Sequence, residues 1–248
     1  MEDREVVDLF VAHLRTHGHP DLTVQRRPDD ENRGSPDIDA IAGNLAIEHT
    51  SVDTLPNQRR DSEWFVEAVG SLRDVLPTPP FRLRITVEYT AVTTGQNWAD
   101  VRRALATWIL TRAAELPDGR QVVEGIPGVP FRLHVRKDSE TTPALLFSRW
   151  EPEDDTLSAR IRNLFDRKAR KLATYRLSGG TTVLLVQNGD IALMNDWKML
   201  EAIKEAYNST LPAGIDQIWY ADSSIPGNIR FVDFTLELAP SAHCENAV

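Results

Sequence analysis

Residues 35–50 read Ser-Pro-Asp-Ile-Asp-Ala-Ile-Ala-Gly-Asn-Leu-Ala-Ile-Glu-His-Thr, a sequence that predicts two short strands joined by a tight turn. Gly43 can adopt the positive φ that a two-residue hairpin turn requires, and Asn44 tolerates turn geometry well. With these two residues in the turn, Ala42 pairs with Leu45. This pairing fixes the face of every side chain on both arms, because a slip of one residue would reverse all of them.

Carboxylates lie on both arms of the predicted hairpin. We expect Asp39 opposite Glu48 and Asp37 opposite Thr50, and directly opposite residues share a face of the sheet. Three neighbouring carboxylates repel one another unless protons or a cation neutralise them, and hard oxygen ligands of this kind suit Mg²⁺ or Mn²⁺. The hairpin therefore predicts a metal site, and the alternative is acids on a solvent-facing edge. The other face would carry Ile38, Ala40, Leu45 and Ile47.

The composition predicts a globular protein of the cytoplasm. Of the 248 residues, 41% are hydrophobic and 26% are charged, which are ordinary values for such proteins. The apolar runs, such as residues 183–186, are too short to cross a bilayer, and the acidic N-terminal residues do not resemble a secretory signal. The lone cysteine, Cys244, excludes an internal disulfide and a thiolate zinc site. The net charge of −9 argues against a general nucleic-acid binder but allows a local basic groove.

Hydrophobic periodicity predicts a chain of the α/β class. Helices are expected at residues 2–17, from Ser62 to about residue 76, at 97–109, at 157–175 and at 195–207. Strands are expected at residues 23–26, 82–89, 131–135, 182–187, 215–221 and 229–238, in addition to the hairpin. Residues 28–34 are expected to form a polar loop, and residues 240–248 a disordered tail.

Lysines interrupt the apolar face of the helix expected at residues 157–175. Lys168 lies four residues after Leu164 and four before Leu172, in the centre of that face, and Lys171 lies on its edge. Burying an ammonium is costly unless an anion compensates for it, and the acidic face of the hairpin would supply one. The alternative is that the lysine stems pack in the apolar stripe while the amines reach water.

The same helix is basic in a chain of negative net charge. Between residues 160 and 171 its only acid is Asp166. This local patch predicts contacts with phosphates, through the candidate nucleic-acid-binding residues Arg160, Arg167 and Arg170. For Arg162, Arg167 and Arg170 the alternative is a solvated helix face.

Together, these features resemble the PD-(D/E)xK nuclease superfamily. Pro36-Asp37 matches its first motif, and Glu48-His49-Thr50 matches its second, in the expected hairpin order. The resemblance implies a restriction-endonuclease-like core of helix, three-strand meander, helix and strand, with a mixed central sheet. It implies one α/β domain at residues 1–239, with a large α/β insertion at about residues 52–150. Thr50 departs from the pattern, because the family has a lysine there.

The resemblance also implies a mechanism, namely Mg²⁺- or Mn²⁺-dependent hydrolysis of phosphodiester bonds, with DNA as the expected substrate. Asp37, Glu48 and the carbonyl of His49 would hold the ion, and Asp39 would be a further or competing ligand. Some members of the superfamily supply the missing amine from the adjacent helix, and Lys168, or else Lys171, fits that role. It would orient or deprotonate the attacking water. The alternative is an inactive relative that binds nucleic acid or a protein partner.

Overall fold

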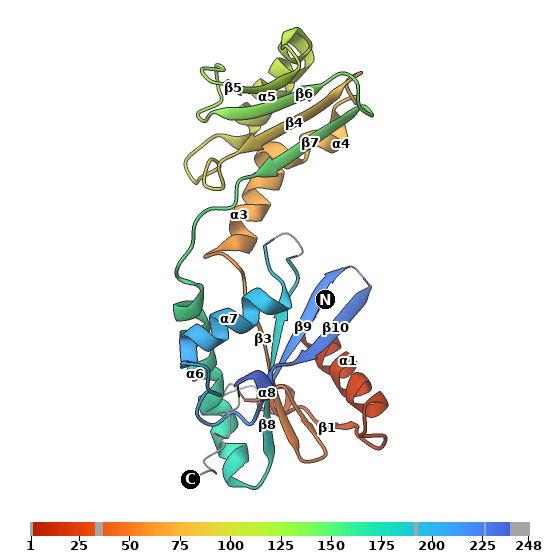
Figure 1. Ribbon diagram of the computed structural model, residues 1–248, viewed down its shortest axis with the longest axis vertical. Helices are drawn as coiled ribbons and strands as arrows, with labels where there is room; N and C mark the ends of the chain where they lie inside the picture. Colours follow the sequence, from red (N-terminus) through yellow and green to blue (C-terminus); the bar gives the residue numbers. More distant parts are fainter. Residues whose placement is uncertain (1, 33–36, 191–192, 226, 239–248) are drawn as a thin grey trace, which may run out of the picture. The chain divides into compact units, whose positions relative to one another are not determined.

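The computed structural model describes residues 2–32, 37–190, 193–225 and 227–238. The chain divides into two compact units, which Figure 1 colours along the sequence. Unit 1 comprises Met1–Leu55 and Asp154–Val248, and unit 2 comprises Pro56–Glu153. Unit 2 covers most of the insertion implied at about residues 52–150, and it has a sheet and an apolar core of its own. Pro36 and the tail from residue 240 lie outside the described residues.

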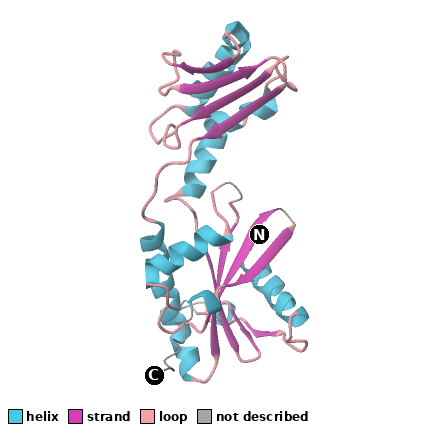
Figure 2. Cartoon of the chain, in the orientation of Figure 1, coloured by secondary structure: helices cyan, strands magenta, loops and turns pink. Residues whose placement is uncertain are grey.

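Unit 1 contains a six-stranded mixed sheet in the order β1-β2-β3-β8-β9-β10. The strands are β1 (Val24–Arg26), β2 (Ala40–Ala42), β3 (Leu45–Ser51), β8 (Thr181–Asn188), β9 (Gln217–Ile225) and β10 (Asn228–Asp233). The pairs β1–β2, β2–β3 and β9–β10 are antiparallel, whereas β3–β8 and β8–β9 are parallel. Helices occur before, between and after these strands along the chain. The predicted α/β class and mixed sheet are therefore confirmed (Figure 2).

The predicted hairpin forms between β2 and β3. Its cross-strand pairs are Ala42 with Leu45, Ile41 with Ala46 and Ala40 with Ile47. Gly43 has a φ of 58°, which the turn requires and which glycine adopts without strain. The ladder ends at Ala40, so the strand does not continue through Asp37 and Asp39. The expected face of Ile38 is therefore wrong, because this side chain packs with Ala46 and not with Ala40 and Ile47.

Helices cover both faces of the unit 1 sheet (Figure 1). On one face α1 (Asp3–Thr16) packs Phe10 against the cluster that contains Ile47. On the other, α6 (Leu157–Leu177) and α7 (Asp196–Tyr207) pack Phe165 and Met199 against the cluster that contains Ala46. Because side chains alternate along a strand, Glu48 faces α6. None of the described helices is long and apolar enough to span a membrane.

Two segments of unit 1 differ from their predicted structure. The strand expected at residues 229–238 ends at Asp233, and α8 (Thr235–Leu238) follows it. The Asp233 carboxylate accepts the backbone N–H of Thr235 at 2.8 Å, which satisfies a free donor at the start of that helical turn. Within the loop expected at residues 28–34, α2 (Pro28–Glu31) forms with proline at its first position, where the missing N–H costs nothing.

Unit 2 is a four-stranded mixed sheet in the order β5-β6-β4-β7, with helices packed against it. Its strands are β4 (Arg82–Val87), β5 (Gly119–Val123), β6 (Leu133–Asp138) and β7 (Ala144–Arg149), and its helices are α3 (Gln58–Phe65), η1 (Val66–Gly70), α4 (Leu72–Val75), α5 (Trp98–Arg112) and η2 (Ala113–Glu115). The expected helix start at Ser62 is wrong, because α3 begins at Gln58 and the Ser62 hydroxyl instead accepts a hydrogen bond from Arg149 at 2.9 Å. The sequence patterns did not predict β5 or β7.

Candidate active site

Glu48 is the centre of a charged cluster inside unit 1. It lies in β3, pairs with Leu184 of β8, and its side chain is 0% exposed. A carboxylate without water needs opposite charges or hydrogen bonds to remain ionised. Glu48 Oε1 receives two ammonium groups from α6: Lys168 Nζ donates one hydrogen bond, and Lys171 Nζ donates another at 3.0 Å.

The two lysines also bind the backbone on either side of that carboxylate. Lys168 Nζ donates to the carbonyl oxygen of His49 at 3.0 Å, and Lys171 Nζ donates to that of Asp37 at 2.7 Å. Residues three apart on a helix share a face, so both amines reach the hairpin from one side. Their side chains are only 16% and 23% exposed. The structure thus places both lysines with an anion, as predicted, and not with amines extended into water.

The environment of Glu48 leaves one of its oxygens without a partner. Burial, and then the nearby charge of Asp39, raise the pKa of Glu48, while Lys168 opposes this shift. Glu48 Oε2 is buried and has no hydrogen-bond partner among the described residues. An unsatisfied buried carboxylate oxygen is costly, and a cation is one group that would satisfy it.

Asp37 is held as an anion by three donors. The hydroxyl of Tyr175 and the backbone N–H of Ile38 donate to Oδ1 at 2.9 and 2.8 Å, and the amide of Asn32 donates to Oδ2 at 2.8 Å. Burial alone would raise the pKa of Asp37, but these hydrogen bonds outweigh it and the pKa is lowered. Burial and the bond to Asp37 raise the pKa of Tyr175 to about 12. At neutral pH the pair is therefore a carboxylate and a protonated phenol.

Asp39 does not join a cluster of three acids. Its Oδ2 accepts the backbone N–H of His49 at 2.6 Å, which satisfies a β3 donor just beyond the end of the β2 ladder. Within residues 2–32, 37–190, 193–225 and 227–238, no group of three or more His, Cys, Asp or Glu side chains is arranged to hold a metal ion. The expected three-carboxylate face is thus not a metal-ligand group among the described residues, although Asp39 lies near enough for its charge to raise the pKa of Glu48.

The imidazole of His49 lies on the other face of β3. Its Nε2 is 3.1 Å from Gln187 Oε1, and its Nδ1 is 3.5 Å from a carboxylate oxygen of Asp3 in α1. Burial lowers the pKa of this imidazole. Only the carbonyl of His49 faces the lysines, as expected from the alternation of side chains along a strand.

The predicted basic patch on α6 is smaller than expected. Arg160 donates to the carbonyls of Asp53 and Thr54 at 2.8 and 2.6 Å and pairs with Asp154 at 2.7 Å. It therefore holds the loop after β3, and its assignment as a nucleic-acid contact is not supported by this geometry. Arg167 and Arg170 are exposed, and neither side chain makes a hydrogen bond or ion pair within the described part of the chain.

The charged cluster brings acidic and basic side chains together within unit 1. No family model, curated protein or solved structure matches this chain. What the cluster does is therefore inferred from its own atoms: a buried carboxylate with one unsatisfied oxygen, two ammonium groups and a second carboxylate fixed in its ionised form.

Tyr175 and Asn32 are site residues that the sequence did not reveal. Tyr175 lies four residues after Lys171, on the same face of α6, and was expected only as an apolar position. A partly buried tyrosine hydroxyl usually finds a polar partner, so its spacing from Lys171 was a usable signal. Asn32 follows α2 in a stretch expected to be loop, where no periodic pattern assigns it a neighbour.

Proposed function

We propose that this chain is a metal-dependent nuclease of the PD-(D/E)xK type that hydrolyses phosphodiester bonds, with DNA as its substrate. One observation carries the proposal: Lys168 and Lys171 of α6 converge on the fully buried Glu48 of β3. These are the charges that phosphodiester hydrolysis needs, because it requires a held cation, an oriented water and stabilisation of negative charge.

The order of the elements in unit 1 supports the proposal. The core elements follow one another along the chain as a helix (α1), a three-strand meander (β1, β2 and β3), a helix (α6) and a strand (β8), and β3 and β8 are parallel. This is the order of a restriction-endonuclease-like core, with unit 2 inserted between β3 and α6. Fold alone does not establish an activity, so the side chains of the cluster remain the stronger argument.

The oxygen atoms of the cluster are of the chemical kind that divalent cations bind. Asp37, Glu48 through Oε2 and the His49 carbonyl would hold it, and Mg²⁺ commonly binds one or two carboxylates while keeping several waters. A bound ion would polarise the phosphodiester, lower the pKa of the attacking water and offset charge on the leaving oxygen. Asp39 is less suited to this role than expected, because it bonds to the backbone of β3.

The chain's own amines and phenol would do the remaining work. Lys168 is the residue we assign to the attacking water, since it bonds to both Glu48 and the His49 carbonyl. Lys171 would stabilise negative charge and hold the Asp37 end of the hairpin. Tyr175 would keep Asp37 ionised and correctly oriented, because its hydroxyl donates to that carboxylate.

The alternative is an inactive relative that binds nucleic acid or a protein partner. The observation that favours it is that Lys168 already bonds to Glu48 Oε1 and to the His49 carbonyl assigned to the cation, so the cluster is partly neutralised without a metal. Thr50, in place of the family lysine, agrees with this alternative. It predicts neither Mn²⁺ binding nor cleavage, with partner binding retained.

The test is cleavage of supercoiled plasmid and labelled oligonucleotides with Mg²⁺ or Mn²⁺. We expect Asp37→Asn and Glu48→Gln each to lower the cleavage rate about 100-fold or more, because each removes an assigned metal ligand. The matched control is Glu205→Gln, an exposed acid in α7, which should cleave like the wild type. Cleavage that survives both substitutions, in protein that keeps its circular dichroism spectrum, would contradict the proposal.

A further inference from the structure

One face of the unit 2 sheet has no apolar cluster against it within the described residues. The buried strand residues Leu83, Ile85, Val135 and Leu145 all belong to the cluster formed with the helices. Because side chains alternate, the residues between them lie on the opposite face. That face carries Arg82, Arg84 and Thr86 of β4, Arg120 and Val122 of β5, His134 and Arg136 of β6, and Leu146 and Ser148 of β7.

Three arginines form a row across three adjacent strands of this face. Arg120 of β5 lies directly opposite Arg136 of β6, and Arg136 lies directly opposite Arg84 of β4. All three are exposed, and none of their side chains makes an ion pair or hydrogen bond with another described residue. Like charges directly opposite each other destabilise a sheet. Since neighbouring strands are about 4.8 Å apart, the row spans about 10 Å.

Aromatic rings lie beside the arginine row. His134 is on the same face as Arg136, two residues away in β6, and its ring meets that of Trp150 edge to face at 5.7 Å. Trp150, directly after β7, is 53% exposed. An exposed ring on the same face as cationic side chains is a combination on which unstacked bases bind.

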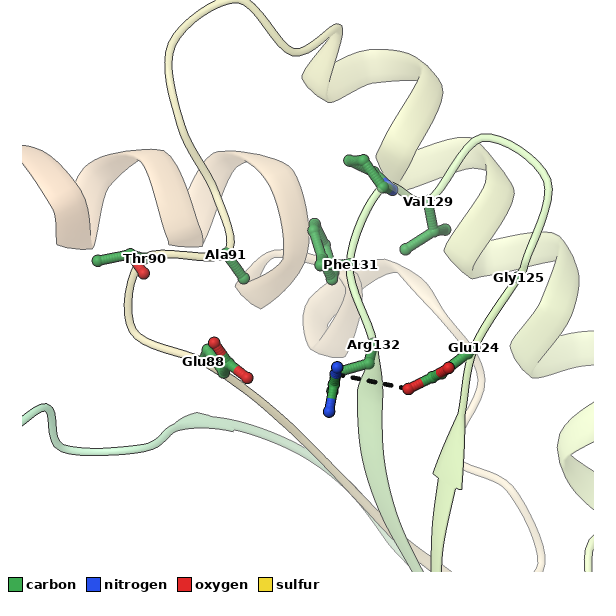
Figure 3. Close-up of a pocket in the computed structure, with 9 residues that line it drawn as sticks. Glu88, Thr90, Ala91, Glu124, Gly125, Val129, Phe131 and Arg132 are labelled. Atoms are coloured by element: carbon green, nitrogen blue, oxygen red, sulfur yellow. Dashed lines mark ion pairs between the residues drawn. The ribbon is translucent and has the colours of Figure 1, made fainter.

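Acids limit the basic surface to one part of the face. Glu88 and Glu124 line an open cavity of about 520 Å³ together with Arg132, and Arg132 pairs with Glu124 at 3.5 Å (Figure 3). Asp138, which lies opposite Arg82, accepts the backbone N–H groups of Glu140 and Thr141 in the turn after β6. The arginine row itself contains no acid, so its charge has to be neutralised by something other than its cross-strand neighbours.

We propose that this face binds single-stranded nucleic acid, with the arginine row on its phosphates and Trp150 stacked on a base. The inference deepens the proposed nuclease function and rests on it for the choice of substrate. Charge complementarity favours a polyanion, and the exposed ring favours a strand whose bases are free to stack. A duplex offers its phosphates but not the faces of its bases, so it should bind this face more weakly.

The experiment measures fluorescence anisotropy of a labelled single-stranded oligonucleotide with the full chain in EDTA. DNA and RNA strands of one sequence and the corresponding DNA duplex are compared over a range of salt concentrations. We expect Arg136→Gln to weaken single-strand binding about tenfold and to reduce the salt slope by about 0.7, the value for one phosphate contact on a single strand. We expect Trp150→Ala to weaken binding about tenfold with an unchanged slope.

The matched control is Arg103→Gln, which removes the same charge from α5 on the helical side of unit 2 and should bind like the wild type. Tighter binding of the duplex than of the single strand, equal binding of polyglutamate, or wild-type binding by both face variants would overturn the inference. If the wild type shows no cleavage but the Arg136 and Trp150 substitutions still weaken binding, the nuclease proposal is removed and this face remains a binding surface.

Discussion

The two units of this chain concentrate charge in opposite ways. In unit 1, two lysines and a glutamate of opposite sign are buried together and satisfy one another. In unit 2, three arginines of the same sign face solvent in cross-strand register, with no acid in the row. The first cluster is complete without a partner except for one carboxylate oxygen, whereas the second has a surplus of charge that only an external anion can balance.

The comparison shows that stability alone does not account for either concentration of charge. A buried ion pair is often no more stable than apolar residues of the same volume, so stability alone is a weak reason to keep one. A row of like charges is costly in the free protein, so stability is no reason to keep it. The proposed function would account for both, with reaction on a phosphodiester at the first and binding of nucleic acid at the second.

Removing the buried acid should destabilise unit 1 more than any other single change considered. Glu48→Ala should lower the free energy of unfolding by about 3–5 kcal/mol, because two largely buried ammonium groups lose their partner. Urea denaturation at pH 7 measures this loss. The triple change of Glu48→Leu, Lys168→Met and Lys171→Met should recover most of it, since no charge is then left unpaired. A loss below about 1 kcal/mol for Glu48→Ala would show that the cluster is not compensated as described.

The two lysines should differ in catalysis although each pairs with Glu48. Lys168→Met should lower the single-turnover cleavage rate about 100-fold or more, the range expected for loss of a group that positions or moves a proton. Lys171→Met should lower it less, because that amine bonds to Glu48 and the Asp37 carbonyl rather than to the His49 carbonyl. Rapid-quench measurements at saturating Mn²⁺ provide both rates. The reverse order would move the catalytic assignment to Lys171.

Tyr175→Phe should lower the free energy of unfolding at pH 7 by about 1 kcal/mol, because the partly exposed Asp37 loses a hydrogen bond. The folded-state pKa of Asp37 is lowered below its ordinary value of 3.8, so this contribution is present above pH 3.8 and is lost as the pH falls through the folded-state pKa. Denaturation at pH 7 and at acidic pH measures the difference between variant and wild type. If the difference stays constant down to pH 2, the Tyr175 hydroxyl does not stabilise the protein through the ionised form of Asp37.

Arg136→Gln should stabilise the free protein slightly, by a few tenths of a kcal/mol at low salt, because it relieves repulsion from Arg84 and Arg120. The gain should disappear at high salt, where exposed charges are screened. Thermal denaturation at two salt concentrations measures it. Arg103→Gln is the control: it loses an ion pair with Asp100 and should show no gain. Destabilisation by Arg136→Gln would mean that the row is already neutralised within the chain.

Local spacing predicted the parts of the site that depend on short-range geometry. The Gly43 turn set the register of β2 and β3, and helical spacing placed Lys168 and Lys171 on one face of α6, so the residues that meet Glu48 were predicted. The extrapolation failed where the strand ended. Ile38 was assigned a face by a period of two, but the ladder stops at Ala40 and this side chain packs with Ala46.

Long-range partners were outside the reach of the sequence patterns. Arg160 was predicted to contact phosphate, but its guanidinium donates to backbone carbonyls of residues more than a hundred positions earlier in the chain. The arginine row depends on the register among β5, β6 and β4, which no local pattern specifies, and β5 was not predicted as a strand. Propensity and periodicity describe one element at a time, whereas these features arise from how elements pair.

Titration of the protein with Mn²⁺, followed by electron paramagnetic resonance of the free ion, measures metal binding at the charged cluster without relying on cleavage. It asks whether Glu48, with Asp37 beside it, holds a divalent cation. We predict one saturable site in the wild type that is lost in Glu48→Gln and weakened in Asp37→Asn, with Glu205→Gln unchanged. Absence of saturable binding, or equal binding by the wild type and a folded Glu48→Gln variant, would contradict the account.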